Sequence, residues 1–197
     1  MSATPITEME MLLCAVQKPK SGGMAFYPLT TPDGEDVRLM FGAVGTFPTY
    51  IPFEPSVYGG HGGEPRKAIR FAITEDALMN SVLDVENKAK ALLDGVGVKY
   101  TWNSAITEGK GPYPATLKCR IWVTGERSAT VRNEAGEAIP MPTQPWPRPR
   151  ANALIEARGV YRMTNGNAGL ILQVAALHLV GQVFGAAPDP FSMEVSN

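Results

Sequence analysis

The sequence predicts a mainly β fold, in which a small, closed or partly open barrel of short strands carries one long inserted helix. The chain of 197 residues contains 17 prolines and 20 glycines, which indicates many turns and loops rather than a helical bundle. Only one segment repeats apolar residues with the helical period over several turns, whereas several short segments alternate apolar and polar residues. Roughly five to seven strands around a single helix suit such a barrel.

The first barrel strand is expected within residues 37–53 (VRLMFGAVGTFPTYIPF), as one strand or as two pieces, because Pro48 requires a bulge or an edge position. A glycine-rich loop separates it from residues 66–74 (RKAIRFAIT), which alternate between two faces. One face holds Lys67, Ile69, Phe71 and Ile73, and the other holds Arg66, Ala68, Arg70 and Ala72. Residues 1–36 form a peripheral segment that is compatible with a short helix over residues 8–16.

The long helix follows directly after this strand, over residues 75–95. Thr74 is suited to cap its beginning, acidic residues occupy its first turns, and Gly95 is suited to end it. A single apolar stripe at spacings of three and four predicts the side that packs on the barrel, and it consists of Leu78, Val82, Val85, Ala89 and Leu92.

Further strands complete the predicted barrel after an irregular segment at residues 98–114. Residues 115–125 (ATLKCRIWVTG) form a clear strand whose apolar side, expected to face the core, consists of Leu117, Cys119, Ile121 and Val123. Residues 128–141 predict a short hairpin with its turn at residues 134–136. Residues 155–180 predict two strands around a tight Asn-Gly-Asn turn at residues 165–167, the first with arginines and a tyrosine and the second nearly all aliphatic.

Composition and charge limit the classes of function. The net charge of −1 argues against a strongly basic nucleic-acid-binding protein, but residues 62–170 hold fifteen Lys/Arg against eleven Asp/Glu, a net of +4. No apolar run reaches the roughly 18 residues of a membrane span, and the acidic N-terminus does not resemble a signal peptide. Cys14 and Cys119 lack metal-ligand or CxxC spacing, so we interpret them as reduced thiols of a cytoplasmic protein.

Three predicted strands combine cations with aromatic residues on a polar side. The side opposite the core in residues 115–125 presents Lys118, Arg120 and Trp122, and the theme recurs at Arg66 and Arg70 and at Arg158, Tyr161 and Arg162. An ordinary solvated face explains any one of these strands alone, but it explains the repetition less well. Cations follow a phosphate backbone, and aromatic rings stack on bases without regard to sequence. A surface that binds a nucleic acid strand is therefore the favoured interpretation.

Nothing in the sequence supports an active site. It contains no nucleophile elbow, zinc-protease motif or phosphate-binding loop, its acidic residues are scattered, and its two histidines lack partners at ligand spacing. We therefore expect a protein that is not an enzyme and that requires no cofactor and no metal.

The order of these segments resembles the single-stranded DNA-binding proteins of bacteriophages related to the T7 group. The resemblance runs from about residue 45 to residue 191. It includes GTFPTYIPFEPSVYGG and GEPRKAIRFAIT followed at once by the long helix, then TLKCRIWV, and then VYRMTNGNAGLILQVAALHLV before a glycine-containing, Phe-containing tail. The best local match is Tyr161–Arg162 before the last hairpin. The motifs are individually unspecific, and their order carries the resemblance.

The resemblance implies an OB-fold, a five-stranded Greek-key barrel with one long inserted helix and long loops, at residues 37–184, followed by a tail at residues 185–197. It implies that the barrel binds and protects single-stranded DNA with little sequence preference during phage replication or recombination, in the cytoplasm of the infected host cell. By position, Tyr161 stacks on a base and Lys118 contacts the backbone. The full set of expected nucleic-acid-binding residues is Arg66, Lys67, Arg70, Lys118, Arg120, Trp122, Arg158, Tyr161 and Arg162.

The family uses a long acidic tail with a terminal aromatic residue to recruit replication proteins, such as polymerase and helicase-primase, and for dimer contacts. Here the tail APDPFSMEVSN has only two acidic residues, and Phe191 is not terminal. The resemblance thus implies recruitment through the tail and a homodimer, and this departure argues against the recruitment. The alternative function is a β-rich phage structural or protein-interaction module whose aromatic and basic face meets protein.

The first strand of the last hairpin must depart from strict alternation of its side chains. Strict alternation places Arg158 and Arg162 on one face of the strand and Tyr161 on the other. Since all three are expected to lie towards the binding groove, one of these placements needs a bulge or twist, and Gly159 is a suitable place for it.

Overall fold

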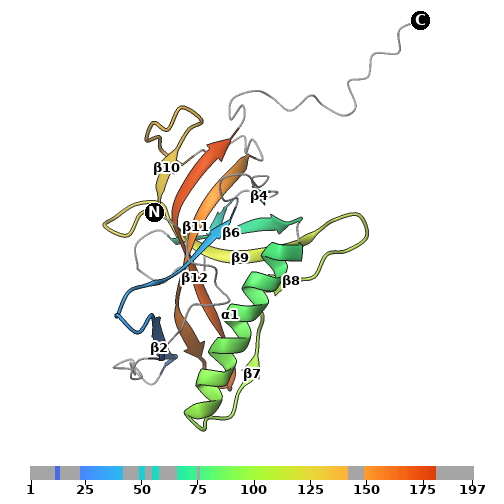
Figure 1. The fold of residues 1–197 in the computed structure, drawn as a ribbon, viewed down its shortest axis with the longest axis vertical. Coiled ribbons are helices and arrows are strands. Elements are labelled where there is room, and N and C mark those ends of the chain that lie inside the picture. The colour runs from blue at the N-terminus through green and yellow to red at the C-terminus, as the bar shows by residue number, and fades with distance from the viewer. Residues whose placement is uncertain are drawn as a thin grey trace, which may run out of the picture.

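The structure is a computed structural model that describes residues 12–13, 23–41, 49–51, 55–57, 66–74, 76–141 and 149–180. Within these residues the fold is mainly β with one long helix, as the sequence predicts. Two long, curved strands, β11 and β12, run side by side through the molecule, and helix α1 lies along its lower half beside the short strand β7 (Figure 1).

The described part of the chain contains twelve strands and helix α1 (Asp76–Gly95). In chain order the strands are β1 (Leu12–Leu13), β2 (Ala25–Thr30), β3 (Val37–Phe41), β4 (Thr49–Tyr50), β5 (Ser56–Val57), β6 (Arg66–Ile73), β7 (Thr101–Trp102), β8 (Ile106–Thr107), β9 (Ala115–Trp122), β10 (Thr130–Arg132), β11 (Arg150–Arg162) and β12 (Asn167–Val180).

Five of these strands close into a barrel. They are hydrogen-bonded in the order β11, β4, β6, β9 and β12, and the additional pairing of β11 with β12 closes the ring. Around this ring β9 is followed by β12 and then by β11, whereas β11 precedes β12 in the chain. As a result, β9 pairs in parallel with β12, while the other neighbours in the ring are antiparallel. This ring confirms the five-stranded OB-like barrel, and the split of residues 37–53 into β3 and β4 confirms two strand pieces.

Alternating side chains of the barrel strands and one stripe of α1 form a single core. Ile69 and Phe71 of β6 and Leu117 and Ile121 of β9 are at most 1% exposed. This confirms the inward side predicted for β9 and identifies the face of β6 with Ile69 and Phe71 as its inward side. From α1 the core receives Val82, Val85, Ala89 and Leu93, all fully buried. The predicted Leu78 and Leu92 are partly buried and pack against the same core, and Leu93 extends the fully buried stripe at a spacing of four from Ala89.

The N-terminal residues contribute more to the sheet than their composition indicates. Strand β2 pairs with β11, and its Tyr27 and Leu29 are buried in the core. The helix considered over residues 8–16 is wrong at Leu12–Leu13, because these two residues pair with β2 as strand β1 and sheet pairing overrides a weak local helical pattern. The proposed division at residues 36 and 37 stays a prediction. The tail, residues 185–197, and Cys14 lie outside the described residues.

A bulge lies where the sequence requires one. The register between β11 and β12 shifts between Ala157 and Gly159, and Gly159 has a φ of 155°. Ala157 and Val160 are both fully buried, although strict alternation would place them on opposite faces. The bulge therefore puts Arg158 and Tyr161 on the same side of the strand, away from the core, and moves Arg162 to the other side.

Candidate nucleic-acid interface

The side of the barrel strands and of β2 that faces away from the core is here called the outer face, and on β6 and β9 it carries a ladder of cations. In the register of this pair, Arg70 lies directly opposite Lys118, and Ala68 lies opposite Arg120. Like charges at directly opposite positions of an antiparallel pair destabilise the sheet. Such an arrangement is expected where the surface has an anionic ligand.

The neighbouring side chains hold this ladder in place. Arg66 lies over the ring of its cross-strand partner Trp122, 5.2 Å from the ring centroid, and the tryptophan is partly buried. Arg70 donates hydrogen bonds from Nη1 to the Oγ1 atoms of Thr107, at 3.0 Å, and Thr116, at 3.4 Å. The cations at positions 66 and 70 are thus positioned by an aromatic ring and by threonine hydroxyls, which carry no negative charge.

A groove of about 170 Å³ opens beside this ladder and brings together residues that are far apart in the sequence. It joins Lys118 and Arg120 of β9 to Tyr161 of β11, three of the nine residues that the sequence predicts for binding. None of the residues that line it is acidic. The complete lining consists of Asn103, Ser104, Ala105, Lys118, Cys119, Arg120, Tyr161, Leu170, Ile171 and Leu172.

Tyr161 is fixed in the groove by a glycine. Its cross-strand partner is Gly169 of β12, where a Cβ atom would lie 3.0 Å from the Tyr161 hydroxyl oxygen and 3.1 Å from Cε1 of the ring. The same Cβ would lie 2.5 Å from the carbonyl oxygen of Asn103. The absence of a side chain at Gly169 therefore lets the tyrosine ring and the segment around Asn103 approach β12 closely.

The other wall of the groove is held by a buried carboxylate on α1. Glu86 is 1% exposed and accepts hydrogen bonds from the Ala105 backbone N–H at 2.7 Å, from Ser104 Oγ at 2.9 and 3.0 Å, and from Trp102 Nε1 at 3.3 Å. Backbone hydrogen bonds tie the same segment to β12, from Asn103 N–H to the Ala168 carbonyl at 2.7 Å. The segment that was expected to be irregular is thus anchored on two sides.

Tyr100 and Trp102, which precede the segment Asn103–Ala105 in the chain, pack against the C-terminal part of α1. Trp102 meets Tyr100 edge to face with ring centroids 6.0 Å apart, and Lys90 lies over the Trp102 ring at 5.4 Å. The Tyr100 hydroxyl donates to Asp94 Oδ1 at 2.8 Å, and desolvation together with this carboxylate raises the pKa of Tyr100. This cluster adds contacts between the wall and the helix to those made by Glu86.

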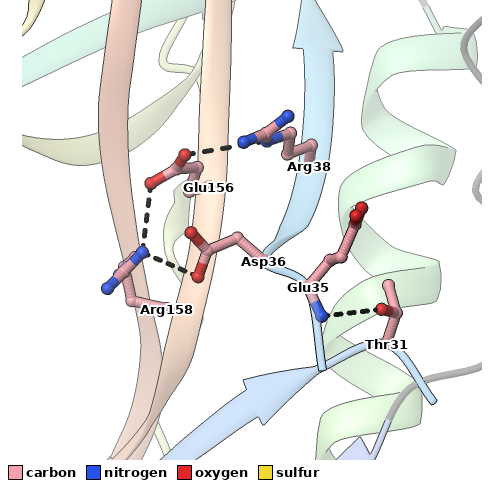
Figure 2. A network of polar contacts seen from close by, with 6 residues as sticks. All are labelled: Thr31, Glu35, Asp36, Arg38, Glu156 and Arg158. Atoms are coloured by element: carbon pink, nitrogen blue, oxygen red, sulfur yellow. Dashed lines mark hydrogen bonds and ion pairs between the residues drawn. The ribbon is translucent and has the colours of Figure 1, made fainter. Parts of the chain in front are cut away.

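Arg158 belongs to an ion-pair network outside the groove. Its Nη1 lies 2.7 Å from Asp36 Oδ1 and 3.3 Å from Glu156 Oε2, and the same Glu156 pairs with Arg38 at 3.7 Å. Figure 2 shows Glu156 between the two arginines, with Asp36 reaching Arg158 from the segment before β3. These carboxylates give Arg158 a role in joining β3 to β11, so its predicted contact with nucleic acid stays a prediction.

Two other predicted residues lie outside both the groove lining and the ladder of cations on β6 and β9. Arg162 donates from Nε to the carbonyl oxygen of Lys99 at 3.0 Å, next to the last hairpin. Lys67 lies opposite Ile121, on the other side of β6 from Arg66 and Arg70. The structure therefore gathers Arg66, Arg70, Lys118, Arg120, Trp122 and Tyr161 on the outer face.

Several residues of this surface were not predicted from the sequence. Glu86 and the segment Asn103–Ala105 carry no local signal, since one is an acid on a helix and the others are two polar residues and an alanine in a stretch expected to be irregular. Phe26 lies opposite Tyr161 on β2, within residues that were assigned to a peripheral segment. Only the phase of β2, with Tyr27 and Leu29 buried, would have indicated that Phe26 faces outward.

Within the described ranges, no cluster of three or more His, Cys, Asp or Glu side chains could hold a metal ion. The same part of the chain contains no helix that is both long and apolar enough to cross a membrane.

Comparison with known proteins finds similarity at the level of fold. No protein-family model matches the sequence, and no curated protein sequence does either. Among solved structures, gp2.5, a single-stranded DNA-binding protein encoded by bacteriophage T7, is similar with a TM-score of 0.52 and 12% identity, over 82% of this chain and 96% of that chain.

A second phage protein shares the fold. The single-stranded DNA-binding protein from bacteriophage Enc34, in complex with single-stranded DNA, is similar with a TM-score of 0.52 and 14% identity, over 89% of this chain and 99% of that chain. Another structure of the same protein gives a TM-score of 0.51 and 13% identity, over 91% of this chain and 96% of that chain. The resemblance noted in the sequence is thus confirmed for the fold of most of the chain.

Proposed function

We propose that this protein binds and protects single-stranded DNA with little sequence preference, through the groove and the outer face of β6 and β9. The observation that carries the proposal is the meeting of Lys118, Arg120 and Tyr161 in one groove. Two cations follow the phosphates of a strand, and a tyrosine ring stacks on any base because every base has a π-face. The similarity in fold to two phage proteins described as single-stranded DNA-binding supports it.

The protein then acts in phage DNA replication or recombination, in the cytoplasm of the infected cell, by coating exposed strands and not by catalysis. Within this proposal Arg66 and Arg70 extend the cationic track beyond the groove along β6, and Trp122 supplies the ring on which Arg66 rests. Contacts with replication proteins and a homodimer belong to the same proposal, as they do for the family that the sequence resembles.

Tyr161 provides the test of this function. Tyr161→Ala removes a stacking ring, so affinity for dT and dA oligonucleotides should fall alike, by roughly ten- to hundredfold, because one stacked base contributes about 1–3 kcal/mol. Tyr161→Phe should retain most of the affinity, because stacking requires the ring and not the hydroxyl. Fluorescence anisotropy with labelled oligonucleotides measures both variants.

The rival function, a module that binds protein, predicts a different result. In that case oligonucleotide affinity is weak in the wild type and does not depend on the ring at position 161. Equal affinities of the wild type and Tyr161→Ala, with both proteins folded by circular dichroism, would reject the DNA-binding groove.

A further inference from the structure

Phe26 is the direct neighbour of Tyr161 on the outer face. In the antiparallel pair of β2 and β11, Phe26 lies opposite Tyr161, and Tyr27 lies opposite Val160. Tyr27 and Val160 are both buried in the core, at 5% and 0% exposure. Because successive side chains of a strand alternate, Phe26 and Tyr161 must both point away from the core. Directly opposite residues have Cβ atoms about 4.5–5.5 Å apart.

Each of the two rings rests on a glycine of the neighbouring strand. A Cβ atom at Gly159 would lie 2.7 and 2.8 Å from Cε2 and Cζ of Phe26, just as one at Gly169 would lie about as close to Tyr161. The glycine at the bulge thus leaves room for the Phe26 ring close to the sheet, and that ring remains partly exposed. Since Phe26 and Tyr161 use different glycines as supports, each ring has its own place on the surface.

The two rings and the cations lie in a row across the strands. The row begins with Phe26 on β2, continues with Tyr161 on β11, crosses β12 at Gly169 and Ile171, and reaches Lys118 on β9 through the groove. We propose that Phe26 is a second base-stacking residue, which receives the nucleobase next to the one on Tyr161. The DNA strand then crosses the barrel from β9 towards β2. This inference rests on the proposed function, since it extends the path of the strand beyond the groove.

A structural role for Phe26 alone, as a cover for Gly159, predicts different behaviour from a stacking role. Phe26→Leu keeps an apolar side chain over Gly159 but has no π-face. Phe26→Trp keeps an aromatic ring with a larger π-face. For stacking, we expect Phe26→Leu to weaken binding of dT and dA oligonucleotides of about fifteen nucleotides by about five- to tenfold, and Phe26→Trp to bind within about twofold of the wild type. The dependence of affinity on salt should not change, because no phosphate contact is removed.

The experiment measures these affinities by anisotropy, with Tyr161→Leu as the reference for loss of one stacked base. The fluorescence of Phe26→Trp is recorded as well, and quenching by dT oligonucleotide beyond that of the wild type supports a base on position 26. The inference is overturned if Phe26→Leu binds with wild-type affinity, or if the oligonucleotide does not quench a tryptophan at position 26. In either case, weaker binding by Tyr161→Leu still shows that DNA binds in the groove. If the wild type itself binds no oligonucleotide, the proposed function fails and this inference fails with it.

Discussion

Replacing Glu86 should both destabilise the fold and weaken DNA binding, because this residue holds one wall of the groove. Glu86→Ala removes the acceptor of the Ala105 N–H and of Trp102 Nε1 and leaves these donors without their partner. An unsatisfied buried donor costs about 1–3 kcal/mol, so the loss should be about 3–5 kcal/mol. Domains are typically stable by about 5–15 kcal/mol, so the variant should still fold at room temperature.

Thermal unfolding followed by circular dichroism provides the first measurement. For a chain of this size, 1 kcal/mol corresponds to a shift of about 2–4 °C, so the melting temperature should fall by about 6–20 °C. The affinity for single-stranded DNA should fall by about three- to tenfold at a temperature where the variant is folded, because a loosened wall must be ordered on binding.

The matched control is Asn87→Ala, at the next and exposed position of α1, which should leave both quantities unchanged. Glu86→Gln, which keeps one acceptor oxygen, should lie between the wild type and Glu86→Ala. A Glu86→Ala variant with the melting temperature and DNA affinity of the wild type would refute the account of the wall.

Two further predictions concern residues packed beside the groove. Gly169→Ala should lower both stability and DNA affinity, because its Cβ would lie 2.5 Å from the Asn103 carbonyl oxygen and displace Tyr161; a thermal melt and a titration that match the wild type would contradict this. Burial raises the pKa of the Cys119 thiol, so the folded state keeps it protonated while the unfolded state ionises it above about pH 8.5. Stability should therefore fall above pH 8.5 by up to about 1.4 kcal/mol per unit of pH, and urea unfolding of Cys119→Ala should lack this slope.

Much of the barrel could be predicted from the sequence because its signals are local. Alternation in β6 and β9 identifies Ile69 and Leu117 as inward residues, and helical spacing identifies α1. The bulge at Gly159 could also be inferred, since alternation alone could not place Arg158 and Tyr161 together. Strand β1 could not be predicted, because two residues carry no periodicity and only their pairing with β2 defines them.

The site could be predicted in part for the same reason. Lys118 and Arg120 follow from the phase of one strand, whereas Tyr161 was expected from the resemblance to the phage family and required the bulge at Gly159. Their meeting in one groove depends on the pairing of β9 and β11 with β12, which no local pattern determines. The ion pair of Arg158 with Asp36 likewise joins segments that are far apart in the sequence, so no local pattern predicts it.

The most direct test of DNA binding by the outer face is the salt dependence of affinity for a single-stranded oligonucleotide, compared between the wild type and the double variant Lys118→Ala with Arg120→Ala. If each side chain neutralises one phosphate, the slope of log K against log salt should become less steep by about 1.4, since each contact to a single strand contributes about 0.7. The melting temperature should change little, because Lys118 is exposed and Arg120 partly exposed. An unchanged slope in a folded double variant, or tighter binding of the wild type to duplex than to single-stranded DNA, would contradict the proposed interface.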